Sequence, residues 1–322
     1  MFRKAKSFFE TVFQALPPEL GGFFWDLHIN SLYLISGARE KNLSVENLEF
    51  SYAELGQKSK PCLVIIHGFS DSKEGFLSLA NYLAQDFYVI IPDLPGFGKS
   101  SKPNLKYSLE LYSNWLDLFL TKLGIFDFHA LGNSMGGAIL LEYNYLFPSK
   151  INSIVLSCSA GLILEEIKGS FYDEYQSGKN LFLIQEEHDF EYFISKIFYK
   201  KEILPSPVKS FVFEKYKQNG SWYSKLMSDI LEPFLNTESK YFLDLQKHKL
   251  ESVNCPTLIL WGEYDGVFPK EIAYEFQKAI SHSELKIIEE VGHLPHMEKP
   301  QEVYKNLLRF YKDHLLHHSY KK

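Results

Sequence analysis

Cysteine is scarce in this chain of 322 residues. Only Cys62, Cys158 and Cys255 are present, and they lie far apart in apolar runs without any C-x-x-C spacing. An odd number of widely separated cysteines argues against a disulfide framework and against a metal site built on thiolates. We therefore expect buried free thiols in a reducing compartment such as the cytoplasm, and no bound metal.

The chain also lacks an excess of positive charge and any long apolar run. Lys and Arg number 34 against 40 Asp and Glu, which gives a formal net charge of -6. A nucleic-acid partner would require a basic face, so none is expected. No uninterrupted apolar stretch approaches the roughly 18 residues that a membrane-spanning helix needs. With 45% hydrophobic and 23% charged residues, the composition is that of a globular protein with a substantial core.

Residues 1–43 are expected to form an N-terminal helical extension. Apolar residues recur there at helical spacing, close to the basic residues Arg3, Lys4 and Lys6. The apolar positions are Phe2, Phe9, Val12, Phe13 and Leu16. Glu10 interrupts this apolar segment and no small-residue cleavage site follows cleanly, so we do not interpret it as a signal peptide. A helix packed on the domain is favoured, with peripheral membrane association through this segment as the alternative.

Short apolar runs alternate with helical patterns from residue 47 onward. Runs typical of strands occupy residues 48–55, 62–68, 87–93, 128–131, 153–159, 257–263 and 284–290. Helical patterns occupy residues 76–85, 109–124, 138–146 and 271–280. This alternation predicts an α/β fold in which a mostly parallel central sheet is flanked by helices on both faces. The core is expected in two parts, residues 44–160 and residues 251–322.

The alternation stops between residues 161 and 250. This stretch favours helices and contains no convincing strand, and sheet-like sequence resumes directly after it. We predict a helical lid, inserted after the sixth strand, that covers the carboxyl edge of the sheet and excludes water from a pocket there. A separate helical domain is the less favoured alternative.

Ser134 lies where a predicted strand must turn sharply into a predicted helix. Its surroundings read Gly132, Asn133, Ser134, Met135, Gly136, which is the G-x-S-x-G pattern of a nucleophile elbow. A serine hydroxyl becomes a good nucleophile only when it stands clear of its neighbours beside a base, and the two glycines leave room for that. Functional groups of parallel sheets gather beyond the carboxyl ends of the strands. We therefore predict that Ser134 is a catalytic nucleophile.

A histidine base is expected in a loop after a late strand. The run GHLPHMEKP follows the strand at 284–290 and offers His293 and His296. We choose His293, because Gly292 permits a tight loop and because His293 lies closer to the end of the strand. A metal site on these two histidines is not expected, since nothing nearby completes a set of ligands.

The acid that orients the base should precede the histidine along the chain. The run WGEYDGVFP places Asp265 in a glycine-flanked turn just beyond a predicted strand. Glu263 and Asp71 compete for this role, but Glu263 lies nearer the strand and is expected to point away. The order Ser134, Asp265, His293 then places each residue at the carboxyl end of a strand.

Attack on an ester carbonyl creates an oxyanion that needs two hydrogen-bond donors. One is expected from the backbone N–H of Met135, because the first N–H groups of a helix have no partner within the helix. The second is expected from the N–H of Phe69, in the HGF run that follows the strand at 62–68. Phe69 and Met135 are therefore the candidate oxyanion-hole residues.

These motifs together resemble the α/β-hydrolase superfamily, of the lidded esterase and lipase type. The resemblance covers residues 47–160 and 251–315, through HGF, DLPGFGKS, GNSMGG, WGEYDGVFP and GHLPHMEKP. HGFSDSKEGF and SAGL are most similar to membrane-associated monoacylglycerol lipases and related bacterial lipases. The resemblance implies a triad of Ser134, Asp265 and His293. It also implies hydrolysis of a small apolar ester such as a monoacylglycerol through an acyl-enzyme, without a cofactor.

Two alternatives remain at this point. GNSMGG also resembles hydrolases that cleave carbon–carbon bonds of ring-fission products. Those enzymes usually carry a glycine-rich, proline-containing loop after HG, whereas this chain has FSDSKEG, and this difference favours esters. The other alternative is a non-catalytic binding protein that retains the hydrolase fold.

Overall fold

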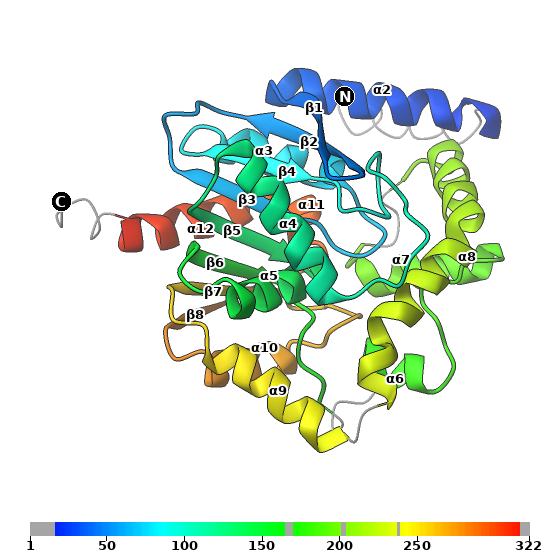
Figure 1. Ribbon diagram of the computed structural model, residues 1–322. Coiled ribbons are helices and arrows are strands. Elements are labelled where there is room, and N and C mark those ends of the chain that lie inside the picture. The colour runs from blue at the N-terminus through cyan, green and yellow to red at the C-terminus, as the bar shows by residue number, and fades with distance from the viewer. Residues whose placement is uncertain (1–16, 165–169, 201–203, 237–238, 316–322) are drawn as a thin grey trace.

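The computed structural model describes residues 17–164, 170–200, 204–236 and 239–315. The apolar residues predicted to form a helix between Phe2 and Leu16 lie outside these ranges. A single sheet with helices on both faces forms the centre of the molecule, and a group of further helices lies beyond one end of the strands (Figure 1).

Eight strands form this sheet in the order β1-β2-β4-β3-β5-β6-β7-β8. β2 pairs antiparallel with β1 and β4, and all pairs from β4 to β8 are parallel, which confirms the predicted mostly parallel sheet. The strands are β1 (Arg39–Val45), β2 (Leu48–Leu55), β3 (Cys62–Ile66), β4 (Tyr88–Pro92), β5 (Phe128–Asn133), β6 (Ile151–Ser157), β7 (Thr257–Gly262) and β8 (Ser283–Ile288).

β1 was not predicted as a strand, and its first residues fall inside the segment expected to be a helical extension. Its sequence REKNLSV is polar because β1 is an edge strand, and most of its side chains are exposed or only partly buried. An edge strand of this kind lacks the apolar run that identifies a buried parallel strand. Residues 39–43 therefore belong to the sheet.

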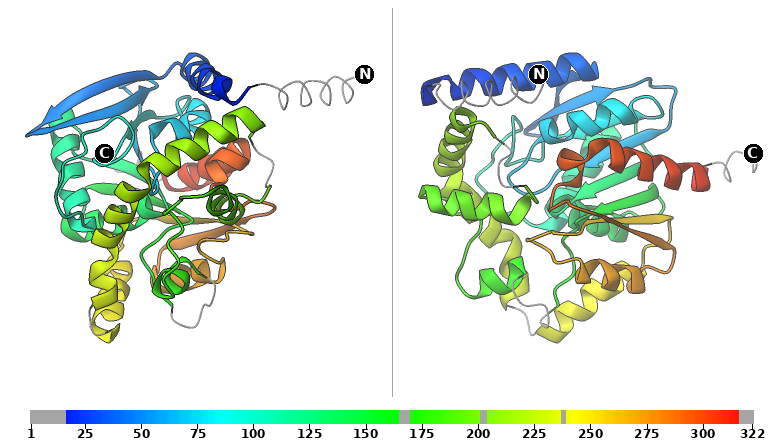
Figure 2. Two further views of the ribbon diagram at one scale, coloured as in Figure 1. Left: turned by 90° about the vertical axis from the view of Figure 1, so that its right-hand side faces the viewer. Right: turned by 180° about the vertical axis from the view of Figure 1, so that it is seen from behind.

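The central strands are buried on both faces, so their side chains point alternately into two hydrophobic cores. In β3, Val64 and Ile66 enter one core while Leu63 and Ile65 enter the other. The first core is closed by α4 (Leu109–Leu123), α5 (Met135–Leu146) and α10 (Glu271–Ala279), and the second by α3 (Leu77–Leu83) and α12 (Pro300–Leu315). Figures 1 and 2 show these two groups of helices on opposite sides of the sheet.

Local sequence signals fix the ends of α4. Ser108 precedes the helix, and its side chain accepts a hydrogen bond from the N–H of Leu111, which satisfies a donor that the helix itself leaves free. Gly124 ends the helix in the left-handed conformation with φ 72°, where a residue without Cβ is favoured. These caps account for the close match between the predicted range 109–124 and the observed helix.

The predicted helical lid is confirmed between β6 and β7. Its elements are α6 (Phe171–Gln176), α7 (Glu187–Ile197), α8 (Ser206–Asn236) and α9 (Ser239–Glu251). In Figure 1 α6, α7 and α8 lie to the right of the sheet, beyond the carboxyl ends of the parallel strands, while α9 lies below it beside α10. The lid therefore covers the edge at which Ser134 was predicted.

The long helix α8 is held to the core and to the N-terminal region at several points. α2 (Gly21–Ser36) follows the short helix η1 (Pro18–Leu20) and packs against both α8 and α3. A Cβ on Gly21 would lie 2.0 Å from the carbonyl oxygen of Pro207, so the two helices are in backbone contact. Trp222 donates its indole N–H to the carbonyl of Gly96 at 2.9 Å. Further along, Asp229 accepts a hydrogen bond from the N–H of Tyr107.

Two short helices complete the core beside the carboxyl ends of β3 and β8. They are η2 (Lys73–Phe76) and α11 (Pro295–Glu298), and they contact each other. Within the described ranges, no helix is both long and apolar enough to cross a membrane.

Phe310 on α12 is fully buried in the second core, whereas Phe126, in the loop before β5, is 63% exposed. We expect Phe310→Ala to lower the free energy of unfolding by about 3–5 kcal/mol, because it removes a buried ring and leaves a cavity. The matched change Phe126→Ala is expected to cost no more than about 0.5 kcal/mol. Urea unfolding of the two variants measures this difference, and similar losses would mean that α12 does not close the core as described.

Candidate functional site

Ser134 occupies a strained turn between β5 and α5. Its backbone has φ 53° and ψ -120°, a region that residues with a side chain rarely adopt. The strain is offset by hydrogen bonds on both sides, since the N–H of Ser134 donates to Ser157 at 3.0 Å and its carbonyl accepts from Gly137 and Ala160. The sharp strand-to-helix turn predicted from the sequence is therefore present.

The two glycines of the elbow are required by close backbone approaches. A Cβ on Gly136 would lie 2.2 Å from the carbonyl oxygen of Ile66, and one on Gly132 would lie 2.5 Å from the backbone of Gly136. No side chain fits at these distances. The glycines therefore let β5, α5 and the end of β3 meet around Ser134.

Asp265 and His293 are in direct contact. His293 Nδ1 and Asp265 Oδ2 are 2.8 Å apart, and both side chains are almost completely buried. Asp265 Oδ1 also accepts hydrogen bonds from the N–H groups of Val267 and Phe268, at 2.8 and 2.9 Å. A carboxylate fixed in this way accepts the Nδ1 proton of the imidazole, which leaves Nε2 with a free lone pair.

The two competing acids have other partners. Glu263 accepts a hydrogen bond from the N–H of Glu290 at 3.3 Å and lies 3.9 Å from the ammonium group of Lys270. Asp71 faces His296, with 3.9 Å between Oδ2 and Nε2. Of the three acids considered from the sequence, Asp265 is thus the one that hydrogen bonds to His293.

The loop that carries His293 is held by residues that the sequence analysis missed. Glu298 accepts the N–H of Gly292 at 2.7 Å with Oε1 and the N–H of Tyr199 at 3.0 Å with Oε2. Burial raises the pKa of Glu298, and these backbone N–H groups act in the opposite direction. Glu298 is present in the run GHLPHMEKP, after the two histidines. Its role was not recognised from the sequence, because its partners are backbone groups that no motif specifies.

Asn133 links the elbow to the same loop. Its side-chain amide donates to the carbonyl of Ser157 at 3.0 Å and to the carbonyl of His293 at 3.2 Å. The residue was recorded in the sequence only as the variable position between Gly132 and Ser134. Its position therefore couples the loop of His293 to the turn at Ser134.

The loop after β3 passes directly beside Ser134. A Cβ on Gly68 would lie 3.3 Å from the Cβ of Ser134. The carbonyl of Gly68 contacts Nδ1 of His67 at 2.7 Å and accepts the N–H of Asp71 at 3.3 Å. Because a trans peptide unit is planar, the N–H of Phe69 points away from these two groups.

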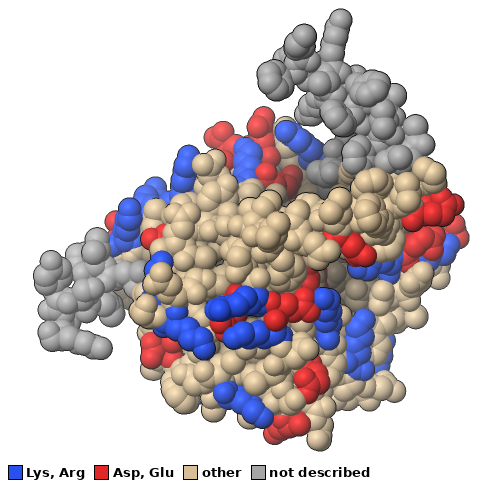
Figure 3. Space-filling view, turned by 90° about the horizontal axis from the view of Figure 1, so that it is seen from above, with Lys and Arg blue, Asp and Glu red and all other residues tan. Residues whose placement is uncertain are grey.

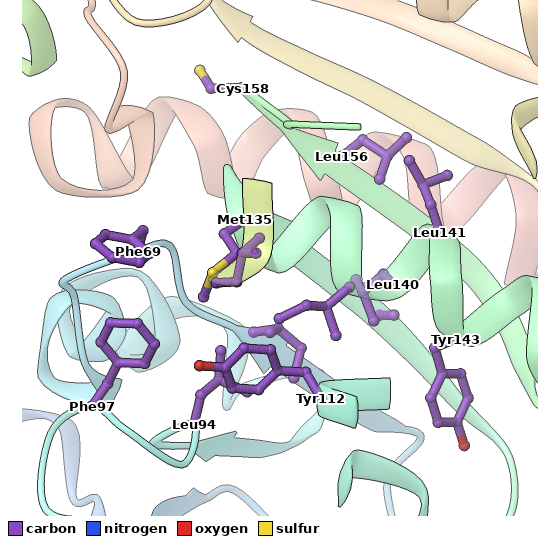
Figure 4. Close-up of a cluster of buried hydrophobic side chains, with 14 of the residues drawn as sticks. Phe69, Leu94, Phe97, Tyr112, Met135, Leu140, Leu141, Tyr143, Leu156 and Cys158 are labelled. Atoms are coloured by element: carbon purple, nitrogen blue, oxygen red, sulfur yellow. The ribbon is translucent and has the colours of Figure 1, made fainter. Parts of the chain in front are cut away.

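The N–H groups of Phe69 and Met135 form no hydrogen bond with any other described residue. Met135 is the first residue of α5, where N–H groups lack helical partners. The ring of Phe69 packs against Phe97 at 5.2 Å and Phe182 at 4.6 Å between ring centroids. Figure 4 shows Phe69 and Met135 coming from different segments to the same region of the core.

A pocket lies over Ser134, between the sheet and the lid. It encloses about 510 Å³, part of which is open to solvent. Apart from Ser134, its walls are nearly all apolar or aromatic, and they are Phe69, Leu109, Met135, Ala138, Ala160, Gly161, Phe171, Tyr172, Phe182, Met227, Ile230, Leu231, Val267 and Phe268. A water-poor chamber of this kind suits an apolar ligand.

A second cavity of about 340 Å³ shares the wall residues Leu109, Ala138 and Gly161 with this pocket. It is more polar, because the ion pair between Glu142 and Lys249 forms part of its lining. The pocket over Ser134 therefore borders a more polar cavity.

Cys158, Asp265 and His293 are the one group in the described ranges whose ligand atoms are close enough to bind a metal ion, within 4.8 Å of one another. The carboxylate and the thiol of this group already have partners within the protein. Asp265 accepts three hydrogen bonds, and Cys158 accepts the N–H of Gly262 at 3.4 Å. Burial raises the pKa of the Cys158 thiol well above its usual value, so the metal-binding thiolate is disfavoured.

Comparison with known proteins agrees with this fold. Residues 61–300 match the family model described as alpha/beta hydrolase fold. Lipase 1 of Psychrobacter immobilis is 31% identical over 88% of this chain and 84% of its own length. Monoacylglycerol lipase ABHD6 of Homo sapiens is 25% identical over 85% of this chain and 82% of its own length. A crystal structure of a membrane phospholipase A superimposes with a TM-score of 0.83 at 26% identity, covering 91% and 92% of the two chains.

Gly136→Ala is expected to abolish the elbow, because the new methyl group would collide with the Ile66 carbonyl. We expect a loss of at least about 3 kcal/mol in the free energy of unfolding. Gly37→Ala is the control, since a Cβ there has nothing within 4 Å and only its positive φ of 65° opposes the change. That control should cost about 1 kcal/mol. Equal free energies of unfolding of the two variants in urea would contradict the close approach of Gly136 to the Ile66 carbonyl.

Proposed function

This chain belongs to the α/β-hydrolase-fold family, and from that premise we propose that it is a serine hydrolase that cleaves carboxylic esters of lipids, such as monoacylglycerols. One observation carries the proposal: the buried Asp265–His293 hydrogen bond lies against Phe268, which lines the same apolar pocket as Ser134. The names of the relatives support the choice of lipid esters, since one is a lipase and another a monoacylglycerol lipase.

In the first step His293 Nε2 removes the proton of the Ser134 hydroxyl, and the oxygen attacks the ester carbonyl carbon. The N–H groups of Phe69 and Met135 stabilise the oxyanion that results. Removing one donor of this kind typically costs about 3 kcal/mol in the transition state. The protonated His293 then gives its proton to the departing alcohol, and an acyl-enzyme on Ser134 remains.

In the second step His293 removes a proton from water, and the hydroxide attacks the acyl-enzyme. Collapse of the second oxyanion releases the acid, and the proton returns from His293 to Ser134. Asp265 keeps the imidazole in the required tautomer and stabilises its positive charge in both steps. Apart from the ester and water, neither step uses a group outside the chain.

The pocket walls favour an acyl chain over a polar group. Each methylene that moves from water into such a chamber contributes about 0.8 kcal/mol of binding free energy. The affinity should therefore increase with acyl length until the apolar chamber is filled. This property supports a lipid ester rather than a small polar ester.

The outer face of α2 supports a further part of the proposal, peripheral association with a lipid surface. Leu27 and Leu34 are 55% and 84% exposed, and Phe23 is 64% exposed on the same helix. Asp26 is the one charged residue in its sequence GGFFWDLHINSLYLIS. Figure 3 shows a broad area without charged side chains on the side that α2 forms. Because α2 packs on α8, a lipid surface at α2 would lie next to the lid.

Ser134→Ala should lower turnover of p-nitrophenyl esters by about 10⁶, because the nucleophile is lost. The wild type, but not this variant, should be labelled by a fluorophosphonate probe. The matched control is Ser153→Ala, which removes a buried serine on β6 that hydrogen bonds to His129. That control should retain both activity and labelling.

Substrate choice is measured with a series of p-nitrophenyl esters and monoacylglycerols of increasing chain length. Retention of ester hydrolysis by Ser134→Ala would refute the proposed nucleophile. Turnover of a vinylogous diketone without ester hydrolysis would favour carbon–carbon bond cleavage instead. Absence of both activities and of probe labelling in the wild type would indicate a binding protein.

The double variant Leu27→Glu/Leu34→Glu tests the lipid surface. We expect its binding to phosphatidylcholine vesicles to fall at least about tenfold, because two apolar side chains lose their burial in the bilayer interface. Hydrolysis of a short, water-soluble ester should not change. Leu118→Glu, a matched change at a 38% exposed position of α4, should bind vesicles like the wild type. Equal vesicle binding by all three proteins would exclude α2 as the docking face.

A further inference from the structure

Three buried polar atoms beside the site have no hydrogen-bond partner among the described residues. They are Oδ2 of Asp71 and both ring nitrogens of His296. Asp71 lies shortly after Phe69 in the loop that follows β3. His296 lies in the short helix α11, which begins just after His293. The loops that carry the proposed oxyanion donor and the proposed base therefore face each other through these two side chains. Their nearest atoms, Oδ2 and Nε2, are 3.9 Å apart.

Both side chains are supported from behind. The ring of His296 is stacked on Phe76, with centroids 3.9 Å apart and planes only 2° from parallel. The carboxylate of Asp71 lies against the backbone of Gly75, where a Cβ would meet its oxygens at 2.6 and 2.8 Å. Packing on η2 therefore places the two groups opposite each other.

Asp71 also acts on the peptide unit that carries the oxyanion donor. Its N–H donates to the carbonyl of Gly68 at 3.3 Å, and that carbonyl shares a planar peptide with the N–H of Phe69. Ser70, between them, has a positive φ of 61°, which a residue with a side chain rarely adopts. A strained turn keeps its shape only when its surroundings hold it. A movement of Asp71 would therefore rotate this peptide unit and change the direction of the Phe69 N–H.

The remaining anchors of this turn come from the lid. Ser70 Oγ is 3.3 Å from the hydroxyl of Tyr216 on α8. On the same helix, burial and then the charge of Asp71 raise the pKa of Tyr223. Burial lowers the pKa of His296, and the nearby His293 adds to this effect while Asp71 opposes it. A neutral His296 still offers one ring N–H to the carboxylate of Asp71.

We propose that Asp71 and His296 are positioning residues that hydrogen bond across this gap and hold the Phe69 N–H in line for the oxyanion. A closure of about 1 Å brings Oδ2 and Nε2 within hydrogen-bond distance and satisfies two buried polar atoms at once. This inference rests on the proposed function, because it concerns the oxyanion of ester hydrolysis. The pair contacts no substrate and acts through the turn at residues 68–71.

Four single variants test the inference by separating the hydrogen bond from the packing. His296→Met and Asp71→Ala remove the donor or the acceptor, and we expect each to lower kcat about 10- to 100-fold with KM unchanged, because the oxyanion exists only in the transition state. His296→Gln retains an N–H donor and Asp71→Asn retains an acceptor, so both should stay within about threefold of the wild type. The double variant Asp71→Ala/His296→Met should be no slower than the worse single variant.

A trifluoromethyl ketone forms an oxyanion when the nucleophile adds to it. Its binding should weaken by the same factor as kcat/KM in the two damaging variants, His296→Met and Asp71→Ala. Asp86→Ala is the matched control, because Asp86 is exposed and pairs with Tyr304 away from the site. Thermal unfolding is measured for every variant. His296→Gln and Asp71→Asn keep the test decisive if the larger changes prevent folding.

Wild-type kcat in both damaging variants would overturn the inference. Equal losses of kcat in the variants that keep a hydrogen-bonding group (His296→Gln and Asp71→Asn) and in those that remove it would also overturn it. Such a result would report packing rather than a hydrogen bond. In either case Ser134→Ala would still be inactive. Failure of the proposed function itself looks different, because Ser134→Ala would then retain activity or the wild type would have none.

Discussion

The backbone around Ser134 is the constraint on which the rest of the site depends. Its positive φ makes the sharp turn between β5 and α5, and the hydrogen bonds to Ser157, Gly137 and Ala160 hold that conformation. β6 supplies the first of these partners, so the pairing of β5 with β6 fixes the backbone of Ser134. Asn133 links the same strand pair to the loop of His293 through the carbonyl of that residue. One strand pair therefore positions both the proposed nucleophile and the proposed base.

Much of the fold was predictable because its central strands are buried on both faces. Such strands appear as short, continuous apolar runs, and their positions were recognised from the sequence. The contact between Asp265 and His293 was also within reach, since β7 and β8 are neighbours whose following loops leave the sheet at the same edge. The choice of Asp265 over Glu263 rested on its distance from the strand end. The structure gives the physical reason, since Glu263 is engaged with the N–H of Glu290.

Other features depend on partners that are distant along the chain, and no local pattern contains them. β1 is polar because it is an edge strand, so its sequence resembles that of a loop. Glu298 contacts backbone groups from the lid and from its own loop, and the position of Asp71 against His296 follows from the packing of η2 on α11. Helical periodicity in residues 161–250 indicated a lid. It could not indicate that Phe182 and Met227 would form the walls of the pocket.

The way α8 is fastened limits how a bulky substrate can enter. This helix has 31 residues. It packs against α2 near its beginning, hydrogen bonds to Gly96 near its middle and hydrogen bonds to Tyr107 beyond that. A helix held at three places does not move as a hinged lid. The pocket over Ser134 is already partly open to solvent, and α6 and α7 are the shorter pieces of the lid beside it. The end of α7 is joined to the segment of the proposed base, because the carbonyl of Ile197 accepts the N–H of His293. A change at the end of α7 that widens the opening would therefore also shift the backbone that carries the imidazole.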